Sequence, residues 1–249
     1  KKALSANAIK AKPIKAKPIK AKTTKANSSG TPLSISPYVQ TATWAKPWWL
    51  SRHNEKIALK NKMGQVDLVF LGDSITHAFD NKAQATWQKY YAQRKALNLG
   101  FGGDRTENVL WRLQHDAVAG INPKLLVLMI GTNNTGHRKD SPEDIALGIK
   151  AIIDDLAVRL PKTKVLLLAI FPRGVDANDP LRVINDKTNN LIKHYDDGKQ
   201  VHYLNINDIF LDEQGVLKKS VMTDLLHPNA NQYDKWADAM APFIKQLME

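Results

Sequence analysis

Three polar or small residues follow an apolar run directly in the stretch LVFLGDSITHAF, residues 68–79. Gly72, Asp73 and Ser74 could form a turn that only ends a strand, or they could display Ser74 as a nucleophile. A serine hydroxyl reacts poorly unless a base removes its proton, and that base must itself be oriented by a third group. If Ser74 is a nucleophile, the sequence should therefore also contain a histidine with a nearby carboxylate.

The stretch TDLLHPNANQY near the C-terminus supplies such a pair. Asp224 precedes His227 by three residues, and a turn of this length can bring the carboxylate to Nδ1 of the ring while Nε2 faces a serine hydroxyl. The alternative is that Asp224 caps a helix and His227 is an ordinary surface residue. The Asp-x-x-His spacing alone does not decide between the two.

A glycine-rich loop lies in the stretch NLGFGGDRTENVLWRL, residues 98–113. Its glycines allow tight turns and unobstructed backbone N–H groups, and Asp104 and Glu107 have the spacing of a capping box at the start of a helix. Such a loop could cradle phosphate, but it lacks the Lys-Ser/Thr ending of a P-loop and does not read G-x-G-x-x-G. In an acyl-transfer enzyme, one of its N–H groups would instead form part of an oxyanion hole.

A pair of amides follows a further apolar run in MIGTNNTG, residues 129–136. Asn133 could donate its side-chain N–H to the same oxyanion, and the alternative is a simple Asx turn.

Five apolar runs alternate with amphipathic stretches from about residue 65 onward, which predicts a single α/β domain. Strands that are each followed by a helix imply right-handed crossovers and a five-stranded parallel sheet with helices on both faces. Ligands bind beyond the carboxyl ends of such strands, where Ser74, the glycine loop and Asn133 would all lie. The predicted strands are residues 66–72, 96–100, 125–131, 164–171 and 201–207, and Ser141 with Pro142 is the predicted start of a long helix.

The N-terminal part differs in composition from the rest. Eleven Lys or Arg and no acid precede Glu55, whereas the remainder has 25 basic against 24 acidic residues. We predict a disordered basic tail at residues 1–30, an arm and helix at residues 31–64 that pack on the domain, and the domain itself at residues 65–249. Three Trp fall within six residues of the arm; they could line a substrate groove, but we favour a clamp that holds the arm, followed by a helix from about Ser51 to Asn61.

The charge distribution bears on partners. Because the positive charge is confined to the tail, we expect no nucleic-acid binding, although the tail could attract an anionic polymer or membrane surface. No run of 18 apolar residues exists to span a membrane. A sequence that starts at Lys1 without Met favours export after removal of a leader, and a cytoplasmic location is the alternative. With no cysteine, disulfides, thiol catalysis and thiolate metal sites are excluded.

In combination these motifs resemble the SGNH (GDSL-type) hydrolase superfamily over residues 38–249, in particular the branch of the platelet-activating-factor acetylhydrolase catalytic subunits. The resemblance implies a three-layer α/β/α, flavodoxin-like fold. It also implies a Ser74, His227 and Asp224 triad and an oxyanion hole built from the N–H groups of Ser74 and Gly103 and the side chain of Asn133. It implies no metal and no organic cofactor. The G-x-S-x-G elbow of the α/β-hydrolase fold is absent.

The expected activity is hydrolysis of short-acyl esters, with acetyl favoured by the resembled branch and an O-acetylated carbohydrate as one substrate. The alternative is a catalytically silent binding module tethered to a polysaccharide by its basic tail, which the intact triad disfavours. Candidate pocket residues are Asp73, Phe101 and Arg173, with Asp73 also expected to orient its turn. Four further residues are assigned no chemistry. His77 and His137 could line the site, but we favour exposed positions on loops or helices, and Trp111 and Arg112 are expected to pack and anchor their helix.

Overall fold

The computed structural model describes residues 25–249. In this range five parallel strands form one sheet in the order β2-β1-β3-β4-β5, which is the doubly wound order of flavodoxin-like folds. The strands are β1 (Leu68–Gly72), β2 (Ala96–Gly100), β3 (Leu125–Met129), β4 (Lys164–Leu168) and β5 (Val201–Leu204). All five predicted strands are present, and the predicted α/β/α class is confirmed.

Three of the predicted strands extend beyond the observed ones. The prediction for β3 ends two residues too late, and those for β4 and β5 end three residues too late. The apolar residues beyond β3 and β4, such as Ile130 and Phe171, remain buried although they have left the sheet. Apolarity reports burial rather than pairing, so it extends into the loops that cover the strand ends.

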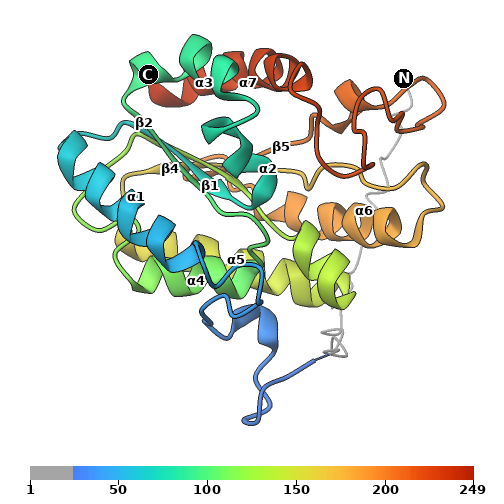
Figure 1. Ribbon diagram of the computed structural model, residues 1–249, viewed down its shortest axis with the longest axis horizontal. Helices are drawn as coiled ribbons and strands as arrows, with labels where there is room; N and C mark the ends of the chain where they lie inside the picture. Colours follow the sequence, from blue (N-terminus) through green and yellow to red (C-terminus); the bar gives the residue numbers. More distant parts are fainter. Residues whose placement is uncertain (1–24) are drawn as a thin grey trace, which may run out of the picture.

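Helices cover both faces of the sheet (Figure 1). On one face lie α4 (Thr106–Gln114), α5 (Pro142–Arg159) and α6 (Pro180–Ile192), and on the other lie α2 (Ser74–His77), α3 (Gln84–Tyr90) and α7 (Gln232–Met248). The predicted start of α5 is confirmed, because the Ser141 hydroxyl accepts the Asp144 N–H and Pro142 is the first helical residue.

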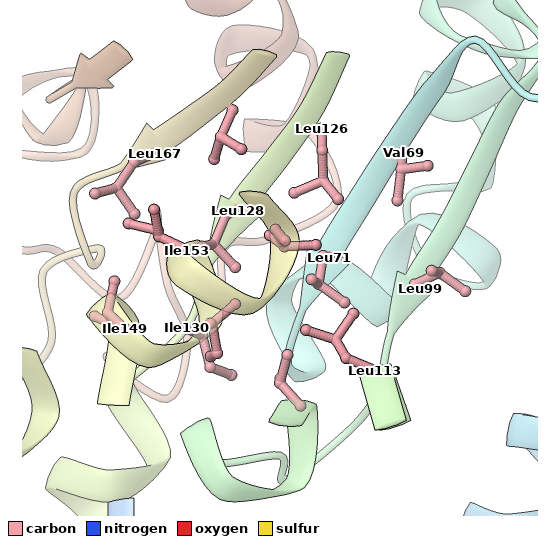
Figure 2. Close-up of a cluster of buried hydrophobic side chains, with 14 of the residues drawn as sticks. Val69, Leu71, Leu99, Leu113, Leu126, Leu128, Ile130, Ile149, Ile153 and Leu167 are labelled. Carbon is pink, nitrogen blue, oxygen red and sulfur yellow. The ribbon is translucent and has the colours of Figure 1, made fainter. Parts of the chain in front are cut away.

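Each face of the sheet has its own core, because neighbouring strand residues point to opposite sides. Val69 and Leu71 face α4 and α5, as the cluster in Figure 2 shows, while Leu68 and Phe70 face the other helices. The result is a rigid platform whose strand ends are fixed on both sides.

The arm and the helix α1 (Trp49–Met63) add a third, smaller cluster. Trp49 and Ala45 are fully buried there against Phe101 of the glycine loop. The predicted helix from Ser51 to Asn61 is thus present but longer by about half a turn at each end.

The predicted basic tail lies mostly outside the described residues, which begin at residue 25. Of the residues assigned to the tail, 25–30 are described, and they form a turn. The Asn27 carboxamide accepts the N–H groups of Ser29 and Thr31, and Lys25 Nζ donates to the Arg138 carbonyl. Asn27, a residue that stabilises turns through its own side chain, was the available signal.

Candidate active site

Ser74 begins α2 at the carboxyl end of β1, which lies between β2 and β3 in the sheet. The preceding Gly72 has no room for a side chain, since a Cβ would lie 2.5 Å from the Met129 carbonyl oxygen. Asp73 caps the short helix, its Oδ1 accepting the Ile75 N–H at 3.0 Å, as predicted. The turn therefore presents the Ser74 hydroxyl at the edge of the sheet, where its Oγ lies 2.8 Å from His227 Nε2.

Asp224 and His227 share one tight turn before α7. Asp224 Oδ2 lies 2.6 Å from His227 Nδ1, and Oδ1 accepts the His227 N–H at 2.8 Å. Leu225 between them has a φ of 57°, a left-handed conformation that costs free energy for a non-glycine residue. Its carbonyl accepts the Gly174 N–H at 2.9 Å, so the loop after β4 stabilises the turn.

The Asp224 carboxylate is held in its ionised form. Partial burial alone would raise its pKa, but the hydrogen bonds from the His227 backbone and ring lower the pKa below the usual value. A charged carboxylate at Nδ1 fixes the ring with Nε2 toward Ser74.

The glycine loop after β2 is held from two directions. The Gly102 N–H donates to His77 Nδ1 at 3.1 Å, and the Gly103 carbonyl accepts from Gln40 Nε2 at 3.2 Å. Gly103 has a φ of 75°, and a Cβ there would lie 1.9 Å from the Trp44 ring. Only glycine fits at this position, for conformational and for steric reasons.

The capping box predicted from Asp104 and Glu107 is wrong by one residue. Arg105 precedes α4, and its N–H donates to Asn108. Asp104 is instead fully buried, accepting from Trp49 Nε1 at 2.6 Å and pairing with Arg112 at 2.9 Å. An aspartate just before a helix can either cap that helix or form a buried ion pair. The spacing of Asp104 and Glu107 is the same in both cases, so it could not distinguish the two roles.

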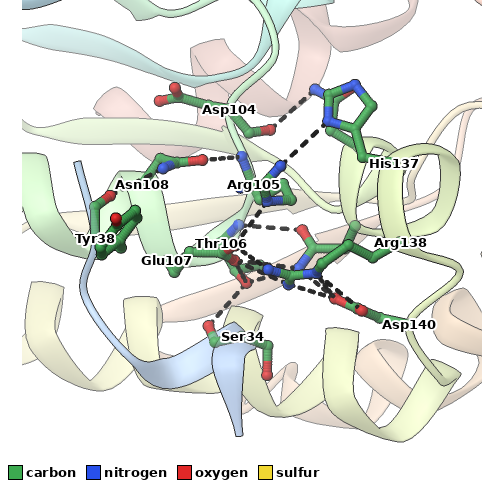
Figure 3. Close-up of polar contacts among 12 residues, drawn as sticks. Ser34, Tyr38, Asp104, Arg105, Thr106, Glu107, Asn108, His137, Arg138 and Asp140 are labelled. Atoms are coloured by element: carbon green, nitrogen blue, oxygen red, sulfur yellow. Dashed lines mark hydrogen bonds and ion pairs between the residues drawn. The ribbon is translucent and has the colours of Figure 1, made fainter. Parts of the chain in front are cut away.

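Asn133 follows β3 and is 6% exposed. Its Nδ2 donates to the Asp104 carbonyl at 2.9 Å, which uses one of its two amide hydrogens. The neighbouring residues form the polar network of Figure 3, in which Arg138 reaches between Glu107 and Asp140. This network joins the loop after β3 to the start of α4 and keeps Asn133 next to the glycine loop.

The three candidate pocket residues have different outcomes. Phe101 is wrong as a pocket residue: its ring is 0% exposed and lies under the Arg112 guanidinium. Asp73 is also too deeply buried, at 1% exposure, and burial raises its pKa to about 7. Arg173 is partly exposed, and its Nη1 donates to the Thr132 carbonyl at 2.8 Å, beside the loop that carries Asn133.

Of the four residues that were assigned no chemistry, three lie as predicted and one does not. His137 is exposed as predicted, and Trp111 and Arg112 pack and anchor α4 as predicted. His77 was wrongly assigned to the exposed residues. It is mostly buried, and burial, reinforced by the Arg52 guanidinium, lowers its pKa to about 4, so a neutral ring accepts the Gly102 N–H.

Sequence reasoning missed the position of the arm. Trp49 is a clamp, as predicted, but Trp44 and Trp48 lie against Gly103 and Gly102 respectively. Arg52 of α1 also donates to the Gly100 carbonyl at 2.8 Å. The cluster of three Trp was the available signal; the burial of Trp49 agrees with the clamp, and the substrate-groove alternative stays a prediction.

Comparison with known proteins agrees with this geometry. The sequence profile of the GDSL-like lipase/acylhydrolase family matches residues 70–235. The chain belongs to this family. It is 35% identical over 202 residues to rat platelet-activating factor acetylhydrolase IB subunit alpha2, covering 81% of this chain and 85% of the relative, and 34% identical to the human protein over the same coverage. The chain is accordingly a carboxylic ester hydrolase.

Solved structures show the same fold at low sequence identity. A Bacteroides fragilis protein described as an acylhydrolase has a TM-score of 0.66 at 19% identity, covering 84% of this chain and all of that one. Axe2, an acetylxylan esterase from Geobacillus stearothermophilus, has a TM-score of 0.58 at 17% identity, covering 75% of this chain and 96% of that one.

Within residues 25–249, no group of three or more His, Asp or Glu side chains is arranged to hold a metal ion. Over the same range, no helix is both long and apolar enough to cross a membrane.

Proposed function

We propose that this hydrolase cleaves short-acyl esters, foremost acetyl esters of carbohydrates, through a Ser74, His227 and Asp224 triad. The observation that carries the proposal is the unbroken chain of contacts from Ser74 Oγ to His227 Nε2, at 2.8 Å, and from His227 Nδ1 to Asp224 Oδ2, at 2.6 Å. Each contact is within the reach that proton transfer and base orientation require.

The reaction then proceeds in two steps. His227 takes the Ser74 proton while Oγ attacks the ester carbonyl, and the protonated ring next delivers this proton to the leaving alcohol. Water, activated by the same ring, attacks the acyl-enzyme and releases the carboxylic acid with Ser74 restored. Asp224 stays ionised throughout and stabilises the imidazolium that forms twice.

The negative charge on the carbonyl oxygen needs donors that are already in position. The proposed donors are the N–H groups of Ser74 and Gly103 and the second amide hydrogen of Asn133. Supporting this assignment, Asn133 is anchored through its first amide hydrogen to Asp104, the residue after Gly103. The Gly103 backbone is also fixed, through its carbonyl bond to Gln40.

The acyl preference is supported by names among the relatives, which include acetylhydrolase subunits and an acetylxylan esterase. Export of the chain, and contact of its Lys-rich tail with an anionic polymer or membrane surface, stay predictions of the sequence.

The direct test of the nucleophile replaces Ser74 by Ala, with Ser220→Ala as control at an exposed serine on the loop before Asp224. We expect Ser74→Ala to lose turnover of p-nitrophenyl acetate while its circular dichroism and melting temperature stay those of the wild type. Near-normal turnover by the purified variant would remove Ser74 from the mechanism.

The substrate class needs a second comparison. We expect kcat/KM to fall from acetyl to butyryl to octanoyl p-nitrophenyl esters, and acetate to be released from acetylated xylotetraose. Preference for the octanoyl ester would contradict the short-acyl proposal, and failure to deacetylate any sugar acetate would contradict its carbohydrate part.

A further inference from the structure

The N-terminal arm and the start of α1 lie against the glycine loop. Three contacts join them: Gln40 to the Gly103 carbonyl, Trp49 to the Asp104 carboxylate, and Arg52 to the Gly100 carbonyl. The arm therefore forms one side of the region in which the proposed oxyanion donor Gly103 lies.

Trp44 is the arm residue nearest to that donor. Its ring is so close to Gly103 that a methyl group could not be placed between them. Even so, Trp44 is 49% exposed, which is unusual for the largest aromatic residue in a tight contact. One part of the ring contacts the glycine loop, and the rest is exposed to solvent.

Trp48 continues this aromatic surface. The rings of Trp44 and Trp48 have centroids 6.3 Å apart and planes inclined by 32°, and Trp48 Nε1 donates to the Trp44 carbonyl at 3.0 Å. On its other side, Trp48 packs against the His77 ring at 5.7 Å. The two indoles are thus fixed in position before any ligand arrives.

A polar groove of about 320 Å³ adjoins the aromatic surface, lined by Pro47, Trp48, Ser51, Arg52, Glu55 and His77. Ser51 Oγ donates to Glu55 Oε1 at 2.9 Å, and both side chains are exposed, so the remaining lone pairs of the carboxylate can accept from hydroxyl groups of a ligand. Aromatic faces beside charged and hydroxyl side chains suit a ligand with apolar C–H faces and many hydroxyls, which is the chemistry of a sugar ring. A lipid tail would displace water from the exposed Ser51 and Glu55 side chains without offering them a hydrogen bond, at a cost in free energy.

We infer that Trp44, Trp48 and this groove form a carbohydrate platform that binds sugar rings of the ester substrate next to the Ser74 site. The inference rests on the proposed function and deepens it, because it assigns the arm a part in substrate choice. Trp44 is the residue that determines specificity: it stacks on the sugar nearest to the reacting ester.

The test compares two substrates in Trp44→Ala, Trp44→Leu and Trp44→Phe. Acetylated xylotetraose offers sugar rings, whereas ethyl acetate offers none. We expect the ratio of kcat/KM for the sugar substrate to kcat/KM for ethyl acetate to fall about tenfold in the Ala and Leu variants and to stay within about threefold in the Phe variant, which keeps a flat ring. Leu preserves apolar bulk, so it separates stacking from simple filling of space.

The matched control is Phe243→Ala, a partly exposed aromatic residue on α7, which is expected to leave the ratio unchanged. Equal losses on both substrates in the Trp44 variants would overturn the inference, because Trp44 would then act only by holding Gly103. A change in preference between acetyl and octanoyl esters without a change in the sugar ratio would also overturn it, in favour of an acyl-chain site.

A binding measurement separates this inference from the proposed function. In the Ser74→Ala background, calorimetry with unacetylated xylotetraose should show binding that Trp44→Leu weakens about tenfold. If wild-type protein turned over no ester, the proposed function would fail while this measurement still decided the platform. If the Ser74→Ala protein and its Trp44→Leu variant bound the sugar equally, the platform would fail with the esterase intact.

Discussion

The strand-end loops and the N-terminal arm build the same site in different ways. The sheet determines where the loops begin, because Gly72 is in register with Gly100 of β2 and with Met129 of β3. Ser74, the glycine loop and Asn133 therefore follow their strands at the same edge of the sheet. The arm is not paired with the sheet. It is held by side-chain contacts with the glycine loop and Asp104, such as those of Gln40 and Trp49. Backbone register thus fixes Ser74 and the proposed oxyanion donors, while side-chain contacts hold the arm against them. Changes in the loops should therefore alter kcat most, and changes in the arm should alter stability, substrate preference and, through the glycine loop, kcat/KM to a smaller extent.

The largest effect is expected from Asp224→Asn, in the turn before α7 that supplies the base to the strand-end loops. An amide at this position cannot hold the ring in the same tautomer, and kcat should drop about 10⁴-fold. Asp212→Asn is the matched control, since Asp212 also accepts two backbone N–H groups in a turn but contacts no histidine. Steady-state kinetics of both variants measure this effect. A loss of less than tenfold in the kcat of Asp224→Asn would contradict the assigned role of Asp224.

A smaller loss is expected from Asn133→Ala. Without one of three oxyanion donors, kcat should fall about 10²- to 10³-fold with little change in KM. An unchanged kcat combined with a lowered melting temperature would make Asn133 a purely structural residue.

The arm is tested by Trp49→Phe, with Trp236→Phe as control. Both residues are fully buried, but only Trp49 donates to a buried carboxylate, Trp236 Nε1 contacting the Met240 sulfur. Loss of a bond to buried Asp104 should cost about 1–3 kcal/mol of unfolding free energy and displace the glycine loop. We expect kcat/KM to fall about tenfold in Trp49→Phe, and less than twofold in Trp236→Phe, at equal folded fraction. Equal activity in the two variants would mean that the arm does not position the loop.

A pH-dependent effect on stability is expected at His77, where the two regions meet. Because its pKa is lowered from 6.5 to about 4, the folded protein keeps the ring neutral while the unfolded chain takes up a proton below about pH 6.5. The His77 contribution to stability is thus complete above pH 6.5 and is lost as the pH falls toward 4. Gln can still accept the Gly102 N–H and does not titrate in this range.

Urea unfolding of wild type and His77→Gln between about pH 7.5 and 4.5 measures this difference. The wild type should lose stability relative to the variant as the pH falls, other titrating groups being common to both. A difference that stayed constant or grew in favour of the wild type would show that His77 is protonated in the folded state.

Much of the site could be predicted because its residues lie directly after apolar strands, and a parallel sheet gathers the loops after its strands at one edge. Ser74, Asp224 and His227 also come with partners whose chemistry requires each other. Phe101 and Asp104 could not be assigned correctly, because their burial depends on Trp49, which lies 55 residues before Asp104 in the chain. His77 was missed for the same reason: its burial depends on Trp48 and Arg52, which no local spacing reveals.

The main proposal is that Ser74 is the nucleophile, and its most direct test is titration with a fluorophosphonate followed by peptide mapping. We predict one label per chain on the Ser74 peptide, loss of ester turnover in proportion to labelling, and no labelling of Ser74→Ala. Stoichiometric labelling of another residue, or full turnover by labelled protein, would contradict it.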